Sequence, residues 1–142
     1  MRYLGLDLGT KTLGMALSDE TGTIAHVLKV ARFSSNDYQA ALKEVKEAVS
    51  TYHVDKIALG LPKNMNNSLG FASTRSLEFK KLLEENIEVP ITLVDERLTT
   101  MEAENILLEA NMRREKRKKV IDGLAAQIIL ETFMHLEEHK NE

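Results

Sequence analysis

The chain has 142 residues, of which 43% are apolar and 29% charged, a usage typical of one globular domain and unlike that of disordered, collagen-like or coiled-coil chains. It contains no cysteine, which excludes disulfides, thiolate zinc sites and a cysteine nucleophile. The net charge of −3 argues by itself against a nucleic-acid partner, and the short apolar runs predict a single cytoplasmic domain over residues 1–142 with no membrane span or signal peptide.

The first predicted strand covers residues 3–10 (YLGLDLGT) and places an acid in an apolar segment. Because side chains alternate along a strand, three leucines share one face and the other carries Gly5, Asp7 and Gly9. The glycines are expected to leave room for a charged ligand such as a metal ion or a phosphate. Pairing of Asp7 with a nearby Lys or Arg is an equally good interpretation of this strand alone.

Two further strands are predicted over residues 12–18 and 23–33, with turn-forming residues between them. Three strands joined by short turns make an antiparallel meander. A helix is predicted after the capping residues 34–37, followed by a short apolar strand over 55–61.

The second half of the chain reads as alternating strands and helices. The polar loop 63–68 is either a ligand-binding loop or a solvated connection, and it leads into a helix that carries Phe79. A buried parallel strand is predicted over 91–94, directly before Asp95 and Glu96. Next comes a helix with a capping box at its start, and its apolar stripe ends at Ala110.

A basic run over residues 113–119 (RREKRKK) contains six cations in seven positions. Since lysines at a helix amino terminus oppose the macrodipole, we predict a loop or frayed turn here, and a last helix from Val120 with Asp122 on its opening turn. Gly123 costs about 1 kcal/mol relative to Ala inside a helix, which indicates that something packs close to it.

The element order predicts an α/β fold: a mixed five-stranded sheet, three antiparallel strands followed by two parallel ones, with helices on its faces. Short right-handed crossovers would bring Asp7 and Glu96 to one edge of the sheet, and the last helix could carry Asp122 across them. Three acids would repel one another unless divalent cations lay between them, and carboxylate ligands favour Mg²⁺ or Mn²⁺ over zinc. Two such ions could hydrolyse a phosphodiester in nucleic acid.

Basic residues beside Asp122 form a candidate nucleic-acid surface. A run of this kind is often only a solvated segment, but its position next to an expected metal ligand favours phosphate contacts. The residues expected to bind nucleic acid are Lys11, Arg113, Arg114, Lys116, Arg117, Lys118 and Lys119.

Four motifs together resemble the YqgF family, the Holliday-junction-resolvase-like nucleases of the RNase H superfamily. They are residues 4–14 (LGLDLGTKTLG), 60–65 (GLPKNM), 95–100 (DERLTT) and 119–130 (KVIDGLAAQIIL).

The resemblance implies an RNase H-like fold, a cytoplasmic location and a nuclease that matures the 5′ end of pre-16S rRNA. Asp7, Glu96 and Asp122 match the family's acidic positions. Asn67 stands where Gly is expected and Phe71 where Pro is common. Partners would be pre-rRNA or branched DNA and precursor ribosomal particles, with the protein a monomer or a homodimer.

Other classes remain open on the sequence. Holliday-junction resolution is an alternative with the same chemistry, and a non-catalytic RNA- or ribosome-binding module is an alternative of another class. The Asp7–Thr10 segment also resembles the first phosphate loop of sugar kinases and actin-like ATPases, but no second such loop follows. His135 to His139 has the spacing of inverted zinc peptidases without a downstream third ligand, so we expect no zinc site there.

Overall fold

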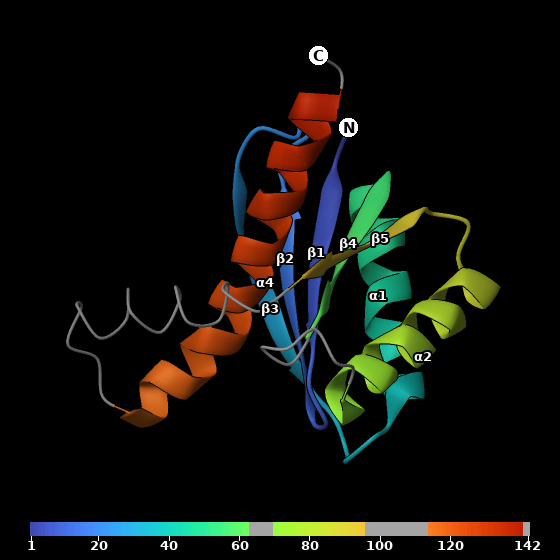
Figure 1. Ribbon diagram of the computed structural model, residues 1–142, viewed down its shortest axis with the longest axis vertical. Helices are drawn as coiled ribbons and strands as arrows, with labels where there is room; N and C mark the ends of the chain where they lie inside the picture. The colour runs from blue at the N-terminus through green and yellow to red at the C-terminus, as the bar shows by residue number, and fades with distance from the viewer. Residues whose placement is uncertain (63–69, 96–113, 141–142) are drawn as a thin grey trace.

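The structure is a computed structural model that describes residues 1–62, 70–95 and 114–140, with 114–122 and 139–140 described by their backbone alone. Five strands and three helices lie in these ranges (Figure 1). In chain order they are β1 (Tyr3–Leu8), β2 (Thr12–Ser18), β3 (Ala25–Arg32), α1 (Tyr38–Tyr52), β4 (Lys56–Leu61), α2 (Phe71–Asn86), β5 (Ile91–Asp95) and α4 (Arg114–Lys140). The helix predicted after the capping box at Thr99 lies outside the described residues.

The strands form one mixed sheet in the order β3-β2-β1-β4-β5. β1 pairs antiparallel with β2, and β2 pairs antiparallel with β3, whereas β1–β4 and β4–β5 are parallel pairs. The turns between the first three strands are too short for a crossover, so these strands must run antiparallel. The predicted meander followed by two parallel strands is therefore confirmed.

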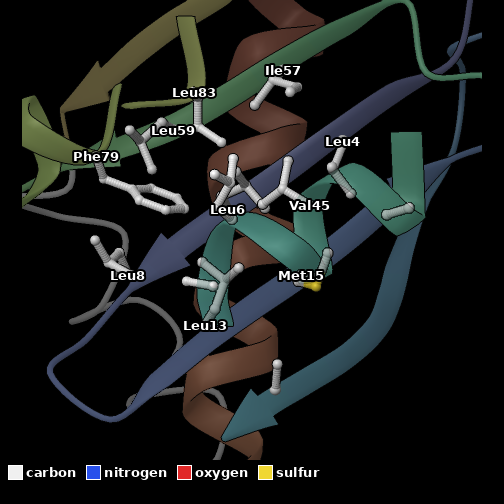
Figure 2. Close-up of a cluster of buried hydrophobic side chains, with 14 of the residues drawn as sticks. Leu4, Leu6, Leu8, Leu13, Met15, Val45, Ile57, Leu59, Phe79 and Leu83 are labelled. Carbon is white, nitrogen blue, oxygen red and sulfur yellow. The ribbon is translucent and has the colours of Figure 1, made fainter. Parts of the chain in front are cut away.

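Alternating side chains give the sheet two apolar faces. On one face, the β1 leucines pack with Met15 of β2, Val45 of α1 and Phe79 of α2, all of them buried. Figure 2 shows this cluster, with α4 behind the sheet on the opposite side. On that opposite face, Ala58 and Val94 of the sheet pack against Ala126, Ile129, Leu130 and Phe133 of α4. Helices thus cover both faces, as predicted.

The basic run is helical, so our prediction of a loop or frayed turn over residues 113–119 is wrong for the described residues. α4 begins at Arg114, and Asp122 is its ninth residue rather than part of its opening turn. Lys and Arg are good helix formers, and the unfavourable macrodipole interaction of an exposed cation is only about 0.3–1 kcal/mol. Figure 1 shows these first turns, in orange, projecting beyond the sheet, while the later, red turns lie along it.

Gly123 is a point of close contact between α4 and the edge strand β3. An ideal Cβ on Gly123 would lie 2.8 Å from Cγ1 of Val27 and 3.4 Å from Cγ2 of Val30. The prediction that something packs close to Gly123 is confirmed. No helix in the described ranges is long and apolar enough to cross a membrane.

Candidate active site

Asp7 lies near the carboxyl end of β1, half-buried, on the face of the sheet that α4 covers. Its antiparallel partner in β2 is Gly14, which contributes no side chain. The strand ends one residue later at Leu8, and a tight turn follows in which the Gly9 N–H donates to the Thr12 carbonyl at 2.8 Å. The carboxyl group therefore stands on a short rigid strand that is held on both sides.

Gly5, two residues before Asp7, allows α4 to pack closely on β1. An ideal Cβ on Gly5 would lie 2.7 Å from both the carbonyl oxygen of Ala126 and the Cβ of Leu130. Our expectation that Gly5 leaves room for a charged ligand is therefore wrong, because α4 fills that space. At Gly9 a Cβ would lie 3.0 Å from the Thr12 hydroxyl oxygen, within the turn itself.

Contacts along β1 show that α4 runs antiparallel to it. The Tyr3 and Phe133 rings meet edge to face, with centroids 5.3 Å apart and an interplanar angle of 86°, while Gly5 meets Ala126 and Leu130. Two residues of strand advance about 6.6 Å, and four residues of helix about 6 Å. The next step along β1 therefore brings Asp7 level with the turn of α4 that precedes Ala126, where residue 122 lies.

The pairing of β2 with β3 is independent evidence that this part of α4 lies level with Asp7. Val30 pairs with Gly14, and Gly14 pairs with Asp7, so the three residues form one row across the sheet. Gly123 packs against the side chains of Val30 and Val27. The α4 backbone at residues 122 and 123 thus crosses the sheet close to the row that contains Asp7.

The carboxyl ends of the parallel strands lie at the same edge as Asp7. β4 ends at Leu61, which pairs with Asp95, the last residue of β5. Val94, one residue earlier, is buried on the α4 face. Glu96 follows directly but lies outside the described residues, and the Asp122 side chain is likewise not described. Among the described residues, no group of three or more His, Asp or Glu could hold a metal ion.

The expected nucleic-acid residues lie at this same edge where they are described. Lys11 is exposed in the β1–β2 turn, and its carbonyl accepts a hydrogen bond from the Phe33 N–H at 3.0 Å. The backbone of the other expected cations from Arg114 to Lys119 forms the first turns of α4, and Arg113 lies outside the described residues. Figure 1 shows the β1–β2 turn and the start of α4 at the lower end of the sheet.

An open groove of about 640 Å³ lies at the opposite edge, between the β2–β3 turn and the last turns of α4. Glu131, Glu137 and Glu138 contribute to its lining together with His135, so the groove is unsuited to phosphate. His135 is the first residue of the peptidase-like spacing, while the side chain of His139 is not described.

Sequence reasoning missed the residues that hold α4 in place. The Lys56 ammonium donates to the Glu137 carboxylate at 2.6 Å, joining β4 to α4 across 81 residues of chain. This hydrogen bond and ion pair raise the pKa of Lys56 above its ordinary value. Such a distant pair leaves no sequence signal. Gly5 did leave one, since a glycine inside a strand marks a close backbone approach.

Comparison with solved structures defines the fold. The chain is similar to Thermus thermophilus RuvC in complex with a Holliday junction substrate, with a TM-score of 0.58, 17% identity and coverage of 91% of this chain and 92% of that one. It is equally similar to the Fowlpox virus resolvase with its substrate Holliday junction DNA, with a TM-score of 0.58, 14% identity and coverage of 95% and 97%. The sheet and α4 therefore form the RNase H-like fold of the RuvC-type resolvases.

Comparison of sequences defines the family. The model described as "RuvX: Holliday junction resolvase" matches residues 1–136. A Bacillus subtilis (strain 168) protein named "Putative pre-16S rRNA nuclease" is 48% identical over 134 residues, covering 94% of this chain and 97% of that protein. A Clostridium acetobutylicum protein of the same name is 45% identical over 135 residues, covering 95% and 98%. The chain belongs to the RuvX (YqgF) family, and is by family a phosphodiester-hydrolysing nuclease.

Proposed function

We propose that this protein is a cytoplasmic, divalent-metal-dependent endonuclease that processes the 5′ end of pre-16S rRNA. Asp7, Glu96 and Asp122 are the catalytic residues and would hold Mg²⁺ or Mn²⁺ in a two-metal site. The observation that carries the proposal is the path of α4, whose backbone at residue 122 crosses the sheet close to the row of Asp7.

Helical periodicity supports the meeting of Asp122 with Asp7. Asp122 shares a helix face with Ile129 and Phe133, seven and eleven residues later, and both are buried against the sheet. Gly123 lies about 100° further round the helix and meets β3. The Asp122 face is therefore expected to turn away from β3, toward β1 and β4.

The donor set suits a hard divalent cation. All three proposed ligands are carboxylates, and the chain has no cysteine that would favour zinc. Without a cation, three converging carboxylates would raise one another's pKa values. When bound, a pair of such ions activates a water and stabilises the leaving oxygen of a phosphodiester. The chain's own part is to hold the carboxylates on a rigid strand and a docked helix, and to bind the substrate backbone.

The basic residues at the edge of the sheet that contains Asp7 are the proposed substrate-binding residues. Lys11 is exposed beside the carboxyl end of β1, and Arg114, Lys116, Arg117, Lys118 and Lys119 belong to the projecting turns of α4. Phosphate contacts from these cations, together with Arg113, would position the nucleic-acid backbone over Asp7 and give salt-dependent affinity. The acidic groove at the opposite edge leaves this basic edge as the favoured face for substrate.

Pre-16S rRNA is the proposed substrate because relatives that are 48% and 45% identical and cover nearly the whole chain are named for it. Precursor ribosomal particles are the corresponding partners, bound by a monomer or a homodimer. Branched DNA is the second candidate, favoured by the resolvase description of the family model. A non-catalytic RNA-binding module is the alternative that the decisive experiment must exclude.

That experiment compares Asp7→Asn with the parent on a pre-16S RNA fragment and on a four-way DNA junction, each with Mg²⁺ or Mn²⁺. Asp7→Asn should reduce cleavage by at least about a hundredfold, the scale seen when one charge-stabilising group is removed from an active site. Asp37→Asn is the matched control, because Asp37 caps α1 through the Ala40 N–H and asparagine caps equally well. Equal cleavage by Asp7→Asn and the parent would reject the proposed metal site at Asp7, and absence of cleavage by the parent would favour the binding module.

A further inference from the structure

Phe71 is an aromatic residue whose side chain is exposed rather than buried in the core. It is the first residue of α2 and its side chain is 92% exposed. The other three phenylalanines of the chain are buried or half-buried: Phe33, Phe79 and Phe133. A ring that stays exposed gains no hydrophobic stabilisation when the chain folds. The residues around Phe71 therefore indicate what kind of ligand could cover it.

The start of α2 is anchored at the same edge of the sheet as Asp7. The Ser73 hydroxyl donates to the carbonyl of Pro62, which directly follows the end of β4. Further along the helix, Phe79 packs in the core beside the β1 leucines (Figure 2). These contacts fix the orientation of α2, so Phe71 is presented on a rigid support.

Arg75 is a half-buried residue of α2 that follows Phe71 by one helical turn. The two residues are four apart, which places them one above the other on a helix, whereas Ser73, Ser76 and Phe79 form the buried face. Arg75 forms no ion pair with another residue in the described part of the chain. The first two turns of α2 contain no acid before Glu78. An aromatic ring with a guanidinium beside it offers stacking and phosphate binding together.

We infer that Phe71 and Arg75 form a contact for one unpaired nucleotide of the substrate, with Phe71 stacking on the base and Arg75 binding its phosphate. The inference rests on the proposed nuclease function and narrows its substrate class. Both faces of a base inside a continuous duplex are covered by its neighbours, so a protein ring stacks most readily on a base that has left its helix. The protein should therefore prefer single-stranded segments, frayed ends or junctions over continuous duplex.

The chain contains no tryptophan, so Phe71→Trp introduces a unique fluorescent reporter at this position. In the Asp7→Asn background, which prevents cleavage, its fluorescence should be quenched by an RNA with an unpaired segment and not by a fully paired duplex of the same length. Ile24→Trp is the matched control, because Ile24 is 66% exposed in the turn at the opposite edge of the sheet. Its fluorescence should not respond to either RNA.

Binding of the same two RNAs provides the second measurement. Phe71→Ala should weaken binding of the RNA with an unpaired segment by about tenfold and leave duplex binding unchanged, while Phe71→Tyr should retain both affinities. The melting temperature of Phe71→Ala should equal that of the parent, since the ring is not part of the core.

Different results would overturn the nuclease function and the nucleotide contact of Phe71 and Arg75. If Phe71→Trp is not quenched although the parent cleaves RNA and Asp7→Asn does not, the inference is overturned and the nuclease stands. If the reporter is quenched although no substrate is cleaved, the contact stands and the nuclease function fails. A change in self-association of Phe71→Ala, with unchanged RNA binding, would assign the ring to an interface between copies and overturn the inference.

Discussion

Gly5 of β1 and Leu130 of α4 approach so closely that an ideal Cβ on Gly5 would lie 2.7 Å from the Cβ of Leu130. The obstacle includes backbone, since the Ala126 carbonyl oxygen lies at the same distance. This contact sets the height of α4 over the sheet and, with it, the separation between β1 and the helix turn that carries Asp122.

Replacing Gly5 should therefore displace α4. Gly5→Val is expected to destabilise the fold by about 1–3 kcal/mol, because no side-chain rotation can relieve the overlap. It should also reduce cleavage in the population that stays folded. Urea unfolding followed by circular dichroism measures the first effect, and a cleavage assay at low temperature measures the second. Stability equal to that of the parent would show that α4 can shift without cost.

The Lys56–Glu137 pair should contribute measurably to the docking of α4. In a double-mutant cycle with Lys56→Met and Glu137→Gln, we expect a coupling of about 1 kcal/mol, since the two side chains are only 29% and 17% exposed. The Lys80–Glu84 pair within α2 is the control, with an expected coupling of a few tenths of a kcal/mol.

The same pair predicts an alkaline pH dependence. Because folding raises the pKa of Lys56 above its ordinary value of 10.5, its stabilisation is complete at neutral pH and is lost as the pH rises through the folded-state value. The stability gap between the parent and Lys56→Met should thus be constant from pH 6 to 9 and narrow at higher pH. A stability difference that widens at alkaline pH would contradict the raised pKa of Lys56.

Asp19 should make the β2–β3 turn sensitive to acid. Its carboxylate accepts hydrogen bonds from the N–H groups of Thr23 at 2.7 Å and Ile24 at 2.9 Å, and from the Thr21 hydroxyl. The Ile24 N–H, then the Thr21 hydroxyl and the Thr23 N–H, hold the pKa of Asp19 far below its ordinary value.

A group whose pKa falls on folding stabilises the fold above its unfolded-state pKa, and that stabilisation is lost as the pH falls through the folded-state value. Asp19→Ala should therefore be less stable than the parent at pH 6, with a smaller gap at pH 3. Urea unfolding at the two pH values measures both gaps. Equal gaps would mean that the charge of Asp19 has no role in the turn.

The helical start of α4 should supply salt-dependent affinity for nucleic acid. Changing Lys116, Arg117, Lys118 and Lys119 to Gln keeps the helix propensity close to that of the parent. The slope of log K against log[salt] should fall by about 0.7–0.9 for every phosphate that the variant no longer neutralises. Lys80→Gln with Lys81→Gln on α2 is the control and should leave the slope unchanged. An unchanged slope in the quadruple variant would show that the basic turns are merely solvated.

The strand directions in the sheet were predictable because they depend on the connections between successive strands. Short turns after β1 and β2 force antiparallel pairing, and the helix between β3 and β4 allows the crossover that sets β4 parallel to β1. The prediction for the start of α4 was wrong because it relied on the unfavourable macrodipole interaction, which is less than about 1 kcal/mol for an exposed cation. The favourable helix propensity of the Lys and Arg residues outweighs this interaction.

The candidate site was predictable only in part. The strand pattern gave Asp7 its position and face, and the family motifs pointed to Asp122. The sequence could not give the height or register of α4 over the sheet, because these depend on Gly5, Gly123 and the Lys56–Glu137 pair, whose partners are far away in the chain. Glu96 stays a prediction, since it lies outside the described residues.

The docking of α4 also fixes the order in which the layers of the core can form during synthesis. The five described strands are synthesised before α4, so until α4 is made one side of the sheet, with Ala58 and Val94, lacks its cover. Asp7 lies on the first of these strands and Asp122 on the helix that is made after them. A nascent chain that ends before α4 therefore carries Asp7 without Asp122, and the proposed centre can assemble only once α4 has docked.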